Sequence, residues 1–65
     1  MRIVAHTKYG VFYSIEQDYD DEEYRELGNL LDRLGSLERF SFETDKGEVY
    51  LTKGMIDDSV FILEK

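Results

Sequence analysis

The sequence feature that most constrains the fold is a helix start in the middle of the chain. Asp20 is a favourable N-cap residue, and Glu23 stands three positions later, as a capping box requires. Tyr19 before the cap and Tyr24 after it occupy the positions of a hydrophobic staple. These signals predict that a helix begins at Asp21.

The residues that follow keep the apolar spacing of a helix with one covered face. This apolar stripe consists of Tyr24, Leu27, Leu30, Leu31 and Leu34. Gly35 comes next and supplies a stop, because glycine adopts the left-handed conformation that ends many helices. The sequence therefore predicts one helix over residues 21–34. Gly28 within it costs about 1 kcal/mol relative to alanine, which we interpret as a sign that helix and sheet approach closely.

Residues 2–7 and 11–16 predict a β-hairpin around a three-residue loop that ends at Gly10 in the left-handed conformation. That register places Arg2 opposite Glu16, an opposite-charge cross-strand pair. One face of the hairpin then carries Ile3, Ala5, Val11, Tyr13 and Ile15.

Residues 39–44 and 48–53 predict a second hairpin around a turn that ends in Gly47. The residues expected to share its apolar face are Phe40, Phe42, Val49 and Leu51. That pairing requires a loop with an even number of residues, and both two- and four-residue loops stay open. After a connection, residues 60–63 form a last strand that is apolar on both faces. Such a strand usually lies in the middle of a sheet or in an interface.

These segments together predict a single small domain over residues 1–65. Its expected class is α+β, an antiparallel β-sheet with one α-helix packed on one face, in the order ββαβββ and with the strand order open. The chain has no cysteine, which excludes disulfides and thiolate zinc sites and favours a cytoplasmic setting. No apolar run approaches the ~20 residues that cross a bilayer, so we expect no membrane partner.

No recognised catalytic or cofactor-binding pattern occurs in the chain. His6 is the only histidine, and the predicted hairpin places no nucleophile or orienting carboxylate beside it. The serines lack the context of a nucleophile elbow, and the glycines lie too far apart for a phosphate-binding loop. Asp18, Asp20 and Glu22 imitate the start of a calcium loop, but Glu23 stands where that loop requires glycine. We therefore expect no enzyme, no cofactor and no metal site.

Charge is concentrated in residues 16–26, which we call the acidic segment. It holds seven carboxylates against one cation, Arg25, and so carries −6 of the net charge of −7. The seven are Glu16, Asp18, Asp20, Asp21, Glu22, Glu23 and Glu26. An acidic balance of this kind argues against nucleic acid or anionic lipid as a direct ligand, because both select for Lys and Arg.

Two explanations of the acidic segment stay open, a helix cap alone or a surface that binds a partner. Acids in a first helical turn complement the helix dipole by about 0.3–1 kcal/mol each. That explanation does not cover Asp18 or Glu26, and Glu22 and Glu26 form an unfavourable like-charged pair. Tyrosines near the acids are suitable interface anchors. The predicted partner-binding residues are Asp18, Asp21, Glu22, Glu26, Tyr9 and Tyr19.

The C-terminal third of the chain, from Phe42 to Lys53 and from Met55 to Glu64, resembles small uncharacterised proteins of phages and prophages. The resemblance includes no functional motif, so no functional residue is carried over from it. It implies a protein that acts by binding a host or phage protein.

The leading hypothesis is a non-enzymatic protein-binding module, an inhibitor or modulator of the phage type. Its acidic helix start would contact a basic surface on a protein partner, such as a surface that binds nucleic acid, whose phosphates the carboxylates imitate. The alternative is a structural or assembly protein that self-associates into a homo-oligomer. In that alternative an exposed apolar sheet face, carrying Phe12, Phe61 and Leu63, forms the interface.

Overall fold

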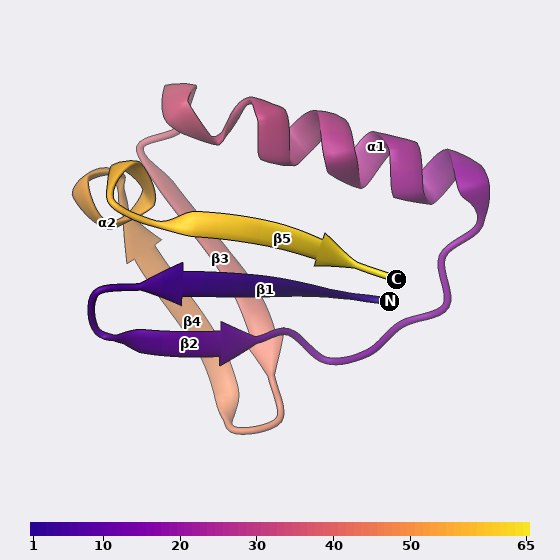
Figure 1. Ribbon diagram of the computed structural model, residues 1–65, viewed down its shortest axis with the longest axis horizontal. Helices are drawn as coiled ribbons and strands as arrows, with labels where there is room; N and C mark the ends of the chain where they lie inside the picture. Colours follow the sequence, from indigo (N-terminus) through magenta and orange to yellow (C-terminus); the bar gives the residue numbers. More distant parts are fainter.

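The computed structural model describes residues 1–65, and its five strands form two antiparallel sheets that pack face to face (Figure 1). The first sheet has three strands in the order β2-β1-β5, and the second pairs β3 with β4. The strands are β1 (Arg2–Thr7), β2 (Gly10–Tyr13), β3 (Arg39–Thr44), β4 (Gly47–Thr52) and β5 (Val60–Glu64). The helices are α1 (Asp21–Asp32), the 3-10 turn η1 (Leu34–Ser36) and α2 (Lys53–Asp57). The predicted α+β class, with a helix packed against antiparallel strands, is confirmed. The single sheet and the order ββαβββ are wrong in detail, because the strands divide into two sheets and the short helix α2 precedes the last strand.

The core lies between the two sheets and is closed at one end by η1 and α2. Its buried members are Ala5, Leu34, Phe42, Leu51 and Ile56. Aromatic rings join the sheets directly, since Phe40 of β3 meets Phe61 of β5 edge to face with ring centroids 6.0 Å apart. The sheets therefore cover one another, and α1 runs along their side (Figure 1).

Two-residue turns close both hairpins, between Thr7 and Gly10 and between Thr44 and Gly47. In each turn the threonine hydroxyl accepts a hydrogen bond from the amide two residues later and donates one to the glycine carbonyl. Gly10 and Gly47 have φ values of 138° and 126°, which side chains with a Cβ atom rarely adopt. The second hairpin has the shorter of the two loops that the sequence left open, so that Phe40 pairs with Leu51 and Phe42 with Val49. The prediction that these four residues share a face is confirmed.

The register predicted for the first hairpin is wrong by one residue. Thr7 pairs with Gly10 rather than with Val11, and Ala5 consequently pairs with Phe12 rather than with Tyr13. Because side chains alternate between the two faces of a strand, this difference moves a whole set of side chains to the other face. Val11 and Tyr13 thus lie on the side of the sheet away from the core, where they are 44% and 47% exposed.

The predicted cross-strand pair between Arg2 and Glu16 is also wrong. β2 ends at Tyr13, so Glu16 lies beyond the sheet, and its carboxylate is 3.8 Å from the amino terminus. Arg2 instead pairs with Glu64 of β5, with 2.7 Å between Nε and Oε1. The position of β1 between two strands explains the change, because β5 offers Arg2 a partner from the far end of the chain.

The last strand, β5, was predicted to lie in the middle of a sheet or in an interface. It lies at an edge of its sheet, so the first of these two predicted places is wrong. β1 is the central strand, and its residues Ile3, Val4 and Ala5 are all buried. On β5, Phe61 faces the core and Leu63 pairs with Ile3 on the same side. Phe12 also packs against the core. The three residues expected on an exposed sheet face, Phe12, Phe61 and Leu63, therefore point inward.

The predicted capping box is confirmed at the start of α1. The Glu23 amide donates to Asp20 Oδ1 at 2.8 Å, and the Asp20 amide donates to Glu23 Oε1 at 3.4 Å. The end of the helix differs from the prediction, because α1 stops at Asp32 and Gly35 lies in η1 without a positive φ. Leu34 explains the change, since η1 turns this side chain into the core.

The predicted reason for Gly28 is wrong. A Cβ atom built at Gly28 meets no other atom within 4 Å, so no part of the sheet approaches the helix there. α1 has no fully buried residue, and Leu31 is the member of its apolar stripe that packs on the core before Leu34. The helix is therefore a loosely covered element with a partly open apolar face.

Candidate partner-binding surface

The backbone of the acidic segment is fixed to the sheets before α1 begins. The Ile15 amide donates to the Glu43 carbonyl at 2.9 Å, and the Gln17 amide donates to the Met1 carbonyl at 2.9 Å. These bonds tie the connection after β2 to the end of β3 and to the residue that precedes β1. The capping box then fixes the first turn of the helix. The acidic side chains are therefore displayed from a backbone that is held in place, and all seven are exposed.

Three of the seven carboxylates have partners within the protein. Asp20 and Glu23 accept the capping hydrogen bonds, and Glu16 lies near the amino terminus. The other four form no ion pair and no hydrogen bond with any other group of the chain. These four are Asp18, Asp21, Glu22 and Glu26. Arg25 forms no ion pair with them, so their charge is not neutralised at short range.

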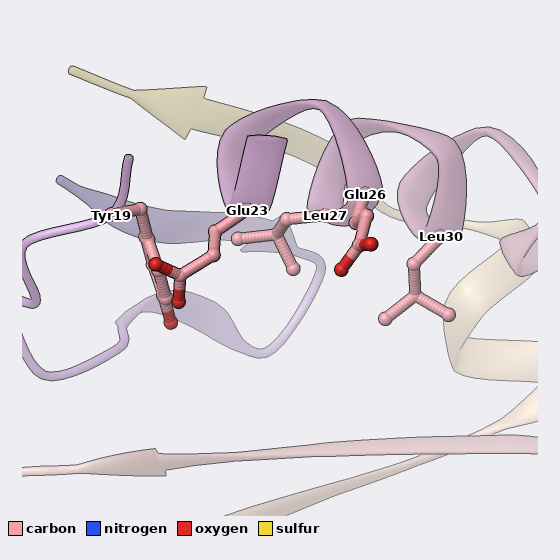
Figure 2. A pocket seen from close by; sticks show the side chains of 5 residues that line it. All are labelled: Tyr19, Glu23, Glu26, Leu27 and Leu30. Carbon is pink, nitrogen blue, oxygen red and sulfur yellow. The ribbon is translucent and has the colours of Figure 1, made fainter. Parts of the chain in front are cut away.

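A shallow groove of about 270 Å³ runs along one side of α1 and brings acidic and apolar side chains together. Its lining consists of Tyr19, Glu23, Glu26, Leu27 and Leu30, and we call it the α1 groove. Figure 2 shows the Glu23, Glu26, Leu27 and Leu30 side chains projecting from the same side of the helix, with the Glu26 carboxylate between Leu27 and Leu30. Tyr19, on the connection that precedes the helix, lies beside Glu23 at one end. The α1 groove can hold an apolar group while its carboxylates face a positive charge.

The structure brings together only part of the predicted set of partner-binding residues. Tyr19 and Glu26 meet in the α1 groove, and Asp21 and Glu22 lie on the adjoining first turn of the helix. Asp18 lines a separate hollow formed with Met1, Glu16 and Gln17. Tyr9 lies apart from all of them, at the tip of the turn between β1 and β2, whereas α1 begins near the other end of the molecule (Figure 1).

Sequence reasoning missed three residues of the α1 groove, Glu23, Leu27 and Leu30. It assigned Glu23 to the cap alone and both leucines to a covered stripe. A signal was nevertheless present, because Glu23, Leu27 and Leu30 follow one another at helical spacing beside Glu26. The spacing alone does not show that this helix face is exposed. It is exposed because the two sheets cover each other and leave α1 partly uncovered.

Other tyrosines are engaged by cations of the same chain. The guanidinium of Arg2 lies 4.6 Å from the centre of the Tyr13 ring, and the ammonium of Lys65 lies 4.9 Å from that of Tyr24. Such contacts are weakly stabilising at exposed sites. The contact of Lys65 also joins the end of the chain to α1. Tyr24 is thus held within the protein, while Tyr19 has no comparable contact and lines the groove.

The largest hollow of the surface lies elsewhere and offers little chemistry. It measures about 550 Å³ and is lined by Arg39, Phe40, Ser41 and Tyr50 on the second sheet. It contains no carboxylate, histidine or buried polar side chain. No group of three or more His, Asp or Glu side chains is arranged to hold a metal ion. Neither helix has the length and apolar character needed to cross a membrane.

Comparison with known proteins adds no relative to this description. No protein-family model, curated protein or solved structure matches the chain. The function is therefore argued from the side chains of the α1 groove and of the acidic segment.

Proposed function

We propose that this protein is a small non-enzymatic binding module that presents the start of α1 to a basic surface of a protein partner. The observation that carries the proposal is a set of four carboxylates without internal partners, of which Glu26 lines a groove with apolar walls and Asp21 and Glu22 lie on the adjoining helical turn. The capping box explains Asp20 and Glu23, but it does not explain an exposed groove in which Glu26 lies beside Leu27 and Leu30.

The two parts of the surface contribute differently to binding. The seven carboxylates of the acidic segment, four of them unpaired, outweigh Arg25 and give it a net charge of −6. A field of this kind accelerates the encounter with a positively charged surface. Tyr19, Leu27 and Leu30 supply apolar area at short range, which stabilises the complex once it has formed. We therefore expect association to slow as salt rises, with a smaller effect of salt on dissociation.

The proposed partner is a protein with a basic groove or patch, such as one that binds nucleic acid. Carboxylates displayed from a fixed backbone can occupy the positions that phosphates take on such a surface. A small protein bound there would block the natural ligand and act as an inhibitor or modulator. The resemblance of the C-terminal third to small phage proteins implies the same role, because phage accessory proteins of this size commonly act by binding other proteins.

The test compares two variants that remove the same charge from different places. The first combines Asp18→Asn, Asp21→Asn, Glu22→Gln and Glu26→Gln. The control combines Glu38→Gln, Glu43→Gln, Asp45→Asn and Glu48→Gln, which are exposed acids without ion pairs in or next to the second sheet. Each tagged protein is used to capture partners from a host lysate at about 50 and 300 mM salt.

We expect the wild type and the control to retain the same partner at low salt and the first variant to lose it. The loss should exceed about tenfold in bound partner, since several charge contacts disappear together. Equal retention by both variants would overturn the proposal, because the acidic segment would then be dispensable. Equal loss from both would also overturn it, because net charge rather than the α1 groove would explain the binding.

A further inference from the structure

A second exposed surface lies on the three-stranded sheet, on the side away from the core. We call it the outer face. The register places Val4 between Tyr13 and Ile62, and His6 between Val11 and Val60. Apart from His6, these central side chains are apolar. No helix or strand crosses in front of β2-β1-β5 in Figure 1, and β3 and β4 lie behind them.

The outer face is large for a chain of this size. Val11, Tyr13, Val60 and Ile62 are 44%, 47%, 62% and 45% exposed. Together they expose roughly 350 Å², most of it apolar, which is comparable with the largest apolar patch of much larger soluble monomers, a patch that is often functional. Polar residues would be the normal choice for the solvent side of an antiparallel sheet. The composition of the outer face therefore indicates that something covers it.

The charge of the outer face does not select a charged partner. Its two ionic side chains, Arg2 and Glu64, pair with each other at 2.7 Å and leave the face without net charge. The acidic segment lies off the sheet, in the connection and helix that follow β2. A basic partner would be attracted there rather than to the outer face. A neutral apolar surface is complementary to the outer face, and a second copy of the same face has that character.

The small core supplies an independent argument for a second copy. Only 7 of the 65 residues are buried, and Leu51 is the one large side chain that is wholly enclosed. Many domains of this size fold alone, but those with a small core commonly gain stability from disulfides, a metal ion or oligomerisation. The chain has no cysteine and no cluster of metal-binding side chains. Of the three means, association with another copy is the one that this chain offers.

We propose that the outer face is the interface of a homodimer with two-fold symmetry, in which Tyr13, Val60 and Ile62 supply most of the exposed apolar surface. The same patch then serves on both subunits, as a two-fold interface requires. Each subunit buries roughly 600 Å², including the flanking polar groups, which is at the low end for specific complexes. We therefore expect a dissociation constant on the order of 10–100 µM.

The decisive measurement is sedimentation equilibrium of the full chain from about 1 to 500 µM, a range that spans the expected constant. The wild type should change from monomer to dimer within this range. Val60→Lys should remain a monomer throughout, because it places a charge in the interface. Tyr50→Lys is the matched control, since Tyr50 is 75% exposed on the second sheet and the change in charge is the same. It should dimerise like the wild type.

A second readout needs no variant and so does not depend on how a variant folds. Amide chemical shifts of the wild type are recorded as its concentration is raised. The concentration-dependent changes should concentrate on Val11, Tyr13, Val60 and Ile62 and spare Tyr50. A wild type that stays monomeric at 500 µM, or shifts that map to α1 or to the second sheet, would overturn the proposal. Failure of either kind leaves the binding function of the α1 groove untouched, because the two surfaces share no residue.

Discussion

The position of the core between two sheets makes a prediction that can be tested with a pair of leucines. Leu51 is 1% exposed and lies in the core, whereas Leu27 lies half-buried on α1 and lines the groove. Substitution of either by alanine removes the same three carbon atoms. If the sheets cover one another, the two losses should differ widely.

The size of the difference follows from burial. Leu51→Ala leaves a cavity among close-packed neighbours, which costs roughly 3–4 kcal/mol. Leu27→Ala removes atoms that water already reaches in part, which costs about 1 kcal/mol. A chain of this length has a total stability of roughly 3–10 kcal/mol. Leu51→Ala should therefore remove a third or more of the stability, whereas Leu27→Ala should leave the protein well folded.

Urea unfolding followed by far-ultraviolet circular dichroism measures both variants against the wild type. The slope of the free energy of unfolding with urea should stay constant, so that the shift of the midpoint reports stability alone. A loss of stability in Leu27→Ala that equals or exceeds the loss in Leu51→Ala would refute the reasoning. It would mean that the main core lies between the helix and a single sheet, as the sequence-based prediction assumed, and not between two sheets.

Two further predictions concern the helix and the turns. Asp20→Ala should destabilise the protein by about 1 kcal/mol because the Glu23 amide loses its acceptor; a thermal melt without any shift would contradict the observed cap, and Asp20→Ser should restore most of the loss. Gly28→Ala should stabilise the protein by up to about 1 kcal/mol, since nothing lies within 4 Å of the added Cβ. Gly47→Ala should instead destabilise it by about 1 kcal/mol or more because of the positive φ. The same urea titrations compare these two, and equal effects would show that backbone conformation does not distinguish the two glycines.

Local signals in the sequence predicted local structure well. The capping box depends on residues three positions apart, and both of its hydrogen bonds are present. The second hairpin was also paired correctly, because Phe40 and Phe42 can share a face with Val49 and Leu51 in only one parity of register. In both cases the residues that decide the structure are neighbours in the chain.

Features that depend on distant residues were predicted poorly. The positive φ of Gly10 was expected, but the loop is one residue shorter than assumed, and this exchanged the two faces of β2. The placement of β5 beside β1 joins the two ends of the chain. No residue near Arg2 in the sequence predicts Glu64 as its partner. The helix was likewise expected to end at Gly35. It ends at Asp32 instead, because Leu34 packs in the core from the 3-10 turn η1.

The candidate site shows the same division. A count of charges along the chain locates the acidic segment, because charge is a property of composition. The α1 groove could not be located that way, since Leu27 and Leu30 have the spacing of covered residues. Whether such residues are covered depends on what the second sheet packs against. Here it packs on the first sheet and leaves part of the helix exposed.

The two proposed surfaces are compatible because they use different parts of the molecule. The outer face belongs to β2, β1 and β5, whereas the α1 groove is built from the helix and the residue before its cap. Lys65 follows β5 and reaches the Tyr24 ring at 4.9 Å, so the helix is tied to the same sheet that would form the dimer. A dimer built on the outer face would therefore carry two acidic grooves at a fixed separation. A partner with two basic sites at that spacing would be bound more tightly by the dimer than by either subunit, without any new contact in the groove.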